Sequence, residues 1–350
     1  MRVVQFQRRP NSTNHSIERA FASVRAALPG VTVQRHVCHF ESRGVFKRLY
    51  NIIEAALVQE DVNHITGDVH YLALFLHKRR TLLTIHDCRG MLFETGIRKI
   101  LYHWFWLKIP VSRSALVTVI SEQTKQEVLR YTSCAESKIR VVADPVSSGF
   151  QPAIKKFDSS KPTFLQVGTG KNKNIERVAR ALSGIRCKLE IVGRPSPEAE
   201  EQLKASAVEY HWAADVPDEE MVEKYRASDA VLFCSTYEGF GMPVIEGNAV
   251  GRPVITSDLE PMRSVAGGAA CLVDPYNIAA IRAGVLKVIK DGEYRARLVQ
   301  RGFENAKRFS AEAIARSYMD VYAELMRADK EKRFRWFRWR PSLSGPRLWF

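Results

Sequence analysis

The fold is decided by one stretch of the sequence, Ser235-Thr236-Tyr237-Glu238-Gly239-Phe240-Gly241-Met242-Pro243-Val244-Ile245-Glu246. An apolar run that ends at Cys234 precedes it and predicts a strand. Pro243 is typical of the first turn of a helix, so the glycines lie in the loop between strand and helix. A loop of this kind directs backbone N–H groups toward an anion, and glycine lets a ligand approach closely. The stretch therefore predicts an α/β unit with an anion-binding loop.

The same alternation of short apolar runs and helical periods continues in both directions along the chain, which predicts parallel sheets. We expect strands at 3–6, 32–38, 63–65, 82–85, 116–120 and 139–142, and then at 163–167, 189–192, 231–234, 254–255 and 271–273. We expect helices at 17–28, 46–59, 97–107 and 122–131, and then at 174–182, 197–206, 218–227, 243–250, 278–290, 294–308 and 311–326.

A turn-rich segment separates two such series of strands. It runs from Asp144 to Pro152 without periodicity and stays polar to Pro162. The length of 350 residues also fits two domains. We therefore predict two Rossmann-like, doubly wound α/β domains that face a central cleft, where such folds bind ligands. The expected parts are an N-terminal domain (1–150), a C-terminal domain (151–310), a closing helix (311–328) and a basic aromatic tail (329–350).

Composition narrows the class of protein. Hydrophobic and charged residues make up 45% and 26% of the chain, as in soluble globular proteins, whereas the net charge of +15 calls for anionic partners. We expect no nucleic-acid partner, because the basic residues are dispersed outside the C-terminus and accompany no recognition motif. The six cysteines are far apart, without a Cys-x-x-Cys pair, which favours reduced thiols in a cytoplasmic protein. No apolar run approaches the length of a membrane-spanning helix, and no secretory signal is expected at Met1.

Two carboxylates bracket the loop and the helix behind it. We expect Glu238 to face a ligand and Glu246 to lie about two turns into the helix, roughly 10 Å farther along. The pair could then span a sugar and a ribose. The alternative is a solvated Glu238, a surface Glu246 and glycines that serve only the turn.

This spacing resembles the E-x7-E motif of family 4 glycosyltransferases, and the resemblance extends over nearly the whole C-terminal half, including Val265–Gly268 and Leu272–Pro275. The resemblance implies the GT-B fold and a nucleotide-sugar donor, with Glu238 on hydroxyls of the donor sugar and Glu246 on the ribose. It also implies that backbone amides face the sugar and its diphosphate. The residues of this donor loop are Gly239, Phe240, Gly241, Met242 and Pro243.

A second resemblance lies at Val167-Gly168-Thr169-Gly170-Lys171-Asn172-Lys173-Asn174, where a strand leads through glycines to a helix. Lys173 resembles the family's lysine on the donor diphosphate, and Gly168 and Asn174 belong to the same loop. Many family members have arginine where this chain has Thr169, so Lys171 is a candidate for the second positive charge. Alternatively, both lysines are solvated residues at a helix start.

In the N-terminal half, Thr84-Ile85-His86-Asp87 ends a strand and resembles the family's T-x-H-D segment. The resemblance implies that His86 contacts the donor sugar and completes a catalytic set with Glu238 and Lys173, although a strand-end histidine can also be structural. Asp87 either orients His86 or caps the next helix. Ser121 is expected to cap a helix. The loop at 8–16 replaces the glycine-rich acceptor loop of many relatives.

We therefore expect a retaining transfer of a sugar from a nucleotide-diphosphate sugar to a glycan or lipid-linked acceptor, in cell-surface polysaccharide synthesis. No essential metal is expected, because no D-x-D motif stands near the donor site. A retaining hydrolase would need carboxylates about 5 Å apart, which this spacing does not provide, so the acceptor is expected to attack from the face that the leaving phosphate vacates. The nucleotide base is expected at the strand end Tyr210–Ala213 and at the loop before Asp218. The alternatives are a catalytically silent nucleotide-sugar-binding protein and a sugar-nucleotide epimerase.

The tail Lys330–Arg340 interleaves arginines with aromatic residues, and Arg98–Lys108 combines basic residues with tryptophans. Aromatic residues favour the headgroup boundary, and basic residues favour anionic lipid. Both segments therefore predict an enzyme attached peripherally to the inner face of a membrane. The alternative is that the second segment packs in the core and the tail is an irregular extension.

Overall fold

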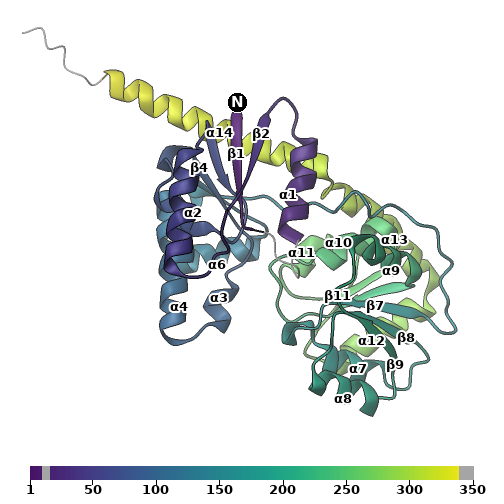
Figure 1. Ribbon diagram of the computed structural model, residues 1–350. Coiled ribbons are helices and arrows are strands. Elements are labelled where there is room, and N and C mark those ends of the chain that lie inside the picture. The colour runs from purple at the N-terminus through teal and green to yellow at the C-terminus, as the bar shows by residue number, and fades with distance from the viewer. Residues whose placement is uncertain (10–15, 339–350) are drawn as a thin grey trace, which may run out of the picture.

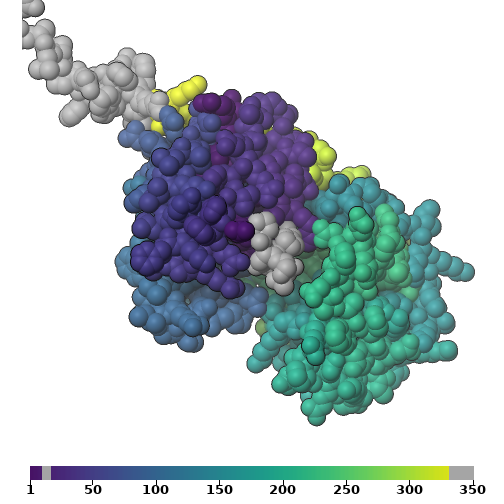
Figure 2. Space-filling model, in the orientation of Figure 1, coloured from purple at the N-terminus to yellow at the C-terminus, as the bar shows by residue number. Residues whose placement is uncertain are grey.

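The computed structural model describes residues 1–9 and 16–338 and contains two lobes, each built on a six-stranded sheet (Figure 1). Figure 2 shows the same lobes as surfaces, the first in purple and blue and the second in teal and green. All paired strands are parallel. The predicted α/β class with two doubly wound sheets is confirmed.

The first sheet has the order β2-β1-β3-β4-β5-β6 and the second the order β12-β11-β10-β7-β8-β9. The strands of the first are β1 (Arg2–Gln7), β2 (Thr32–Val37), β3 (Val62–Ile65), β4 (Thr81–Ile85), β5 (Leu116–Val119) and β6 (Ile139–Val141). Those of the second are β7 (Thr163–Val167), β8 (Lys188–Val192), β9 (Glu209–Ala213), β10 (Ala230–Phe233), β11 (Val254–Ser257) and β12 (Cys271–Val273).

Helices cover both sheets. In the N-terminal half these are α1 (Ser16–Ala27), α2 (Val45–Leu57), α3 (Arg89–Phe93), α4 (Gly96–Tyr102), the wider helix η3 (His103–Lys108), α5 (Ile109–Arg113) and α6 (Glu122–Thr132). In the C-terminal half these are α7 (Ile175–Leu182), α8 (Pro197–Ala205), α9 (Asp218–Ala227), α10 (Met242–Val250), α11 (Met262–Ala266), α12 (Ile278–Lys290), α13 (Gly292–Lys307) and α14 (Ala311–Arg338). Short 3-10 turns occur at η1 (His70–Leu74), η2 (Lys78–Arg80), η4 (Glu136–Lys138) and η5 (Lys171–Lys173).

The predicted strands agree with this architecture, with one omission. The predicted series does not contain β9, although Tyr210–Ala213 was expected as a strand end; β9 is an edge strand with no buried residue, and its sequence mixes charged and aromatic side chains. The predicted helix at 97–107 is divided among α4 and η3. The five-residue helices α3, α5 and α11 were not predicted, because so few residues show no helical period.

The last helix, α14, leaves the second lobe and packs against the first (Figure 1). Tyr318 and Tyr322 are buried in a cluster with residues of β1, α1 and β4. The Tyr322 hydroxyl accepts a hydrogen bond from Gln5 Nε2 at 3.2 Å and is 2.8 Å from Nδ1 of His64. The helix continues twelve residues beyond its predicted end at Met326, to Arg338. Of the aromatic residues that motivated the tail prediction, Phe334, Trp336 and Phe337 belong to this helix, and Trp339, Trp349 and Phe350 lie outside the described residues.

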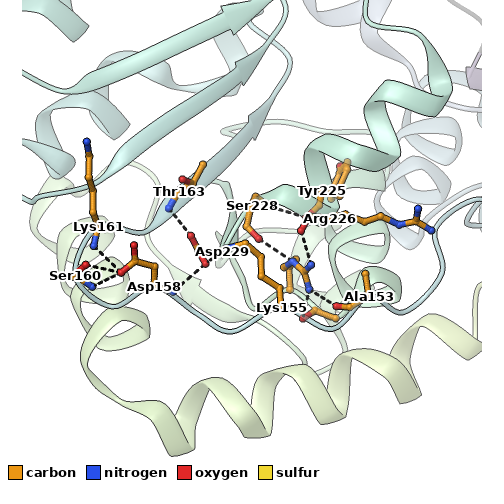
Figure 3. A network of polar contacts seen from close by, with 12 residues as sticks. Ala153, Lys155, Asp158, Ser160, Lys161, Thr163, Tyr225, Arg226, Ser228 and Asp229 are labelled. Atoms are coloured by element: carbon orange, nitrogen blue, oxygen red, sulfur yellow. Dashed lines mark hydrogen bonds and ion pairs between the residues drawn. The ribbon is translucent and has the colours of Figure 1, made fainter.

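The segment after residue 150 is attached to the second lobe by two buried charged side chains (Figure 3). Asp229 accepts hydrogen bonds from the Lys155 ammonium and from the backbone N–H groups of Asp158 and Thr163, at 3.1 and 2.9 Å for the latter two. Arg252 donates to backbone carbonyls that include those of Ser228 and Ala153, at 2.9 and 2.8 Å. These bonds fix the chain's entry into β7.

Replacing Asp229 with alanine should lower the free energy of unfolding by about 3 kcal/mol, because the Lys155 ammonium and two backbone N–H groups lose a buried acceptor. Asp258→Ala is the matched control, since its ion pair with Arg263 is half-exposed and is worth less than about 1 kcal/mol. Urea denaturation followed by tryptophan fluorescence measures both changes. Equal effects of the two substitutions would contradict this role of Asp229.

Candidate active site

The loop between β10 and α10 presents free backbone donors. Gly241 has φ 114°, a conformation that favours glycine, and it turns the chain into α10. Within the part of the chain that the structure describes, the N–H groups of Phe240, Gly241 and Met242 have no hydrogen-bond acceptor. They lie at the positive end of the helix dipole. The loop is thus arranged to bind an anion.

Lys173 and Glu238 are brought together at this loop. Lys173 Nζ is 2.6 Å from Glu238 Oε1, and the two side chains are 19% and 14% exposed. Asn172 Nδ2 donates to the same carboxylate at 3.2 Å and to the Tyr237 carbonyl at 2.8 Å. The 3-10 turn η5 after β7 and the loop after β10 therefore form one constellation, with a cation and a carboxylate side by side.

Gly168 is required for this arrangement. Its φ is 86°, and a Cβ added there would lie 2.7 Å from Cε of Lys173. Any larger residue would therefore push the lysine away from Glu238. Gly168 thus leaves room for the Lys173 side chain beside Glu238.

The other predicted residues of the η5 loop differ in their surroundings. Lys171 is exposed and has no ion pair among the described residues, so it remains a candidate second cation. Thr169 packs beside Gly193 at the end of β8. Asn174 is buried, and its amide nitrogen donates to the carbonyls of Cys234 and Pro275 at 3.0 and 2.7 Å. These contacts favour a structural role for Asn174 over its predicted contact with the donor.

Glu246 is the fifth residue of α10, about one turn into the helix. The prediction of two turns was wrong, because the eight positions from Glu238 to Glu246 include the loop residues 239–241, and α10 begins at Met242. The Tyr225 hydroxyl of α9 donates to Glu246 Oε2 at 2.5 Å. Burial raises the pKa of Glu246, an effect that this hydrogen bond and the nearby Arg19 and Lys173 oppose. Glu246 is therefore a partly buried carboxylate with one oxygen engaged by the protein.

His86 has partners on both ring nitrogens. Nε2 is 2.9 Å from the Thr66 carbonyl, and Nδ1 is 3.6 Å from the carboxylate of Asp144. Burial disfavours the charged ring, but the attraction of Asp144, the Thr66 carbonyl and Asp68 outweighs it and raises the pKa of His86 from 6.5 to about 9. His86 is therefore an imidazolium at neutral pH.

Asp87 was predicted either to orient His86 or to cap the next helix. Its Oδ1 accepts from the backbone N–H of Arg89 at 2.9 Å, at the start of α3. Asp144 and not Asp87 holds His86. The helix-start role of Asp87 is the one that the structure supports.

The donor loop and the first lobe touch directly. A Cβ on Gly239 would lie 2.8 Å from the carbonyl oxygen of His86, so only glycine fits between them. The Ser121 hydroxyl donates to the Gly239 carbonyl at 2.8 Å and also caps α6, as predicted, by accepting from the Thr124 N–H. Tyr237 donates to Glu127 of α6 at 3.2 Å. His86 and Glu238 are thereby placed in adjoining loops.

Three residues of this site were missed by sequence reasoning. Asn172 lies beside Lys173 and could have been found from that position. Tyr225 lies in a helix between two predicted strands, and no local signal marks it. Asp144 was interpreted only as part of a turn-rich linker. The loop at 10–15, in the predicted acceptor region, lies outside the described residues.

Residues 148–305 match the model of the family described as glycosyl transferases group 1. The O-antigen chain mannosyltransferase B of Escherichia coli is 35% identical over 107 residues, which make up 31% of this chain and 28% of that protein. The matches span between 27% and 30% of the length of four curated relatives, so the chain aligns with less than a third of each.

Two solved structures show the fold. Sucrose-phosphate synthase from Thermosynechococcus elongatus has a TM-score of 0.74 at 16% identity, over 94% of this chain and 100% of that one. HepE from Anabaena, in complex with UDP and glucose, has a TM-score of 0.71 at 14% identity, over 93% and 100%. The architecture is GT-B, as predicted.

The His86–Asp144 pair should make stability depend on pH. Because the folded pKa lies above the unfolded value, the pair's contribution is fully present below pH 6.5 and is lost as the pH rises through about 9. Asp144→Asn should therefore lower the melting temperature at about pH 6 and have little effect above about pH 9.5. Asp87→Asn is the control, and we expect its change in melting temperature to be the same at both pH values. Calorimetry at both pH values measures it, and a pH-independent loss in Asp144→Asn would refute the assignment.

Proposed function

We propose that the protein is a glycosyltransferase that moves a sugar from a nucleotide-diphosphate sugar to a glycan or lipid-linked acceptor. The observation that carries this proposal is the constellation of Lys173, Glu238 and the free N–H groups at the start of α10. Transfer requires stabilisation of the departing diphosphate and of a positively charged sugar centre. The amides and Lys173 serve the first need, and Glu238 serves the donor sugar.

We propose that the anomeric configuration is retained, by attack of the acceptor on the face that the leaving phosphate vacates. The resemblance to a retaining family supports this. Glu246 is engaged by Tyr225 and lies one turn inside α10, a position suited to the ribose rather than to nucleophilic attack. We also propose that no metal is essential, because the Lys173 ammonium and the free N–H groups at the start of α10 can offset the charge of the departing diphosphate.

The relatives' names suggest the sugar and the biological setting. Two of them are named O-antigen chain mannosyltransferases, one from Escherichia coli and one from Salmonella typhimurium. We propose a role in cell-surface polysaccharide synthesis, with mannose as the first sugar to test. Among the described residues, no helix is long and apolar enough to cross a membrane. We propose that the protein works in the cytoplasm at the inner face of a membrane, attached peripherally.

The function is tested by thermal shift with a panel of UDP- and GDP-linked sugars, followed by an NMR time course with the best donor. We expect one nucleotide sugar to stabilise the protein and the product to keep the donor's anomeric configuration, at the same rate in EDTA. An inverted product would contradict the retaining mechanism, and a rate that depends on added metal would contradict metal-free transfer. A product with an altered sugar but no acceptor would favour an epimerase.

Lys173→Ala should lower kcat by roughly 10², because a cation that neutralises the leaving diphosphate is lost. Lys171→Ala is the matched control on the same turn, and its exposed side chain predicts a much smaller effect. Steady-state rates with saturating donor measure both. A loss below about threefold in Lys173→Ala would mean that the amides of α10 suffice.

Substitutions of the two carboxylates should affect different kinetic parameters. Glu238→Gln keeps the size of the side chain and should mainly lower kcat, because only Glu238 adjoins the reacting sugar in this proposal. Glu246→Gln should mainly raise the donor KM. Kinetics over a range of donor concentrations separate the two effects, and an exchange of these patterns would reverse the assigned roles.

A further inference from the structure

The first lobe exposes two apolar stripes that a core-facing helix would bury. In α2, Phe46 and Leu57 are 88% and 80% exposed, although Asn51, Ile52 and Ala55 of the same helix are buried. With Leu49 and Ile53, the exposed residues recur every three or four positions and form one outward stripe. The helix is thus apolar on two sides, and only one of them packs on the lobe.

The second stripe runs along α4 and η3. Ile97 is 73% exposed and begins a run at the spacing i, i+3, i+4, i+7 and i+8, which normally faces a protein core. Here the run is exposed. Its members are Ile97, Ile100, Leu101, Trp104 and Phe105.

The two stripes adjoin. Figure 1 shows α2 and α4 on the same side of the first lobe, and residues of both line one cavity of about 950 Å³. We call the exposed residues of α2, α3, α4 and η3 the α2–α4 face. Apolar patches of this size mark interaction sites in soluble proteins.

The charge of the face points to its occupant. Segments 45–57 and 89–108 contain six Lys or Arg and only two Glu. In the described part of the chain, none of the six pairs with a carboxylate; Arg43, just before α2, pairs with Glu41. Lys108 Nζ lies 4.4 Å from the ring centre of Trp104, so a cation and an aromatic ring sit together at the edge of the face. Protein interfaces are depleted in lysine, whereas a lipid headgroup boundary favours this combination.

We propose that the α2–α4 face docks on an anionic bilayer, with both apolar stripes in the headgroup boundary and the basic residues on lipid phosphates. This deepens the proposed membrane location and rests on it, but it does not depend on transferase activity. It also assigns the contact to α2, which sequence analysis did not consider, rather than to the C-terminal tail.

The cavity beneath the α2–α4 face connects the proposed membrane contact with the residues that follow His86. Its lining includes Arg48 and Tyr71 together with Asp87 and Arg89, which follow His86 in the sequence. A bilayer on this face would therefore present a lipid-linked headgroup beside the end of β4. The acceptor would reach the site without leaving the membrane surface.

Flotation of the full chain with vesicles of phosphatidylcholine and phosphatidylglycerol tests the proposal at low salt. Phe46→Glu/Ile97→Glu places charges at two highly exposed positions, so the fold should be unchanged. The matched control is Ile154→Glu/Tyr276→Glu, which charges two exposed apolar positions of the second lobe. A chain ending at Lys330 removes the tail and keeps the contact of Asp329 with Arg80.

We expect the wild type, the control and the shortened chain to float, and the face variant to lose roughly tenfold or more of its binding. Pure phosphatidylcholine vesicles should bind little. The proposal is overturned if the face variant floats like the wild type, if the shortened chain alone loses binding, or if the wild type stays in the soluble fraction. A wild-type dimer that the face variant abolishes, without vesicle binding, would assign the face to a second copy.

Donor hydrolysis by the same proteins without vesicles separates this inference from the proposed function. The face variant should hydrolyse the donor like the wild type, because Phe46 and Ile97 lie outside the donor loops. Loss of flotation with unchanged hydrolysis supports docking. Flotation in the expected pattern without any hydrolysis would remove the transferase proposal and leave the docking surface.

Discussion

The missing side chain of Gly239 is the constraint on which the arrangement of the site depends. The donor loop approaches the carbonyl of His86 so closely that a Cβ would lie 2.8 Å from its oxygen. Because the loop also accepts a hydrogen bond from Ser121, the first lobe fixes the backbone from which Glu238 projects. Sequence reasoning assigned Gly239 to the approach of a ligand. The structure assigns it to the approach of the other lobe, which explains the glycine without a ligand.

The ion pair of Lys173 and Glu238 keeps the charge of the site balanced when no anion is bound. Lys173 is largely buried and would be costly there without a partner, and Glu238 supplies one. In our proposal, a donor diphosphate takes over this partnership and the released carboxylate turns to the sugar. The free amides of α10 add donors that need no rearrangement. His86, held as an imidazolium by Asp144, contributes a fixed positive charge at the adjoining loop.

The strands and the two main loops could be predicted because local signals determine them. Buried parallel strands show as apolar runs, and the glycines before Lys173 and Met242 mark tight turns. The depth of Glu246 was overestimated although the helix start was predicted within one residue, because the loop residues 239–241 were counted as part of the helix. Tyr225 and Asp144 act through tertiary contacts that leave no local pattern. The exposed stripe after Ile97 has the spacing of a buried one, so periodicity predicts a helix there but not which side faces solvent.

The central claim is that the start of α10 and Lys173 bind the diphosphate of the donor. The most direct measurement is a crystal structure of the protein with a bound nucleoside diphosphate. We predict phosphate oxygens within about 3 Å of the N–H groups of Gly241 and Met242 and of Lys173 Nζ, with the ribose at Glu246. A diphosphate bound elsewhere, with Lys173 still paired to Glu238, would contradict the account.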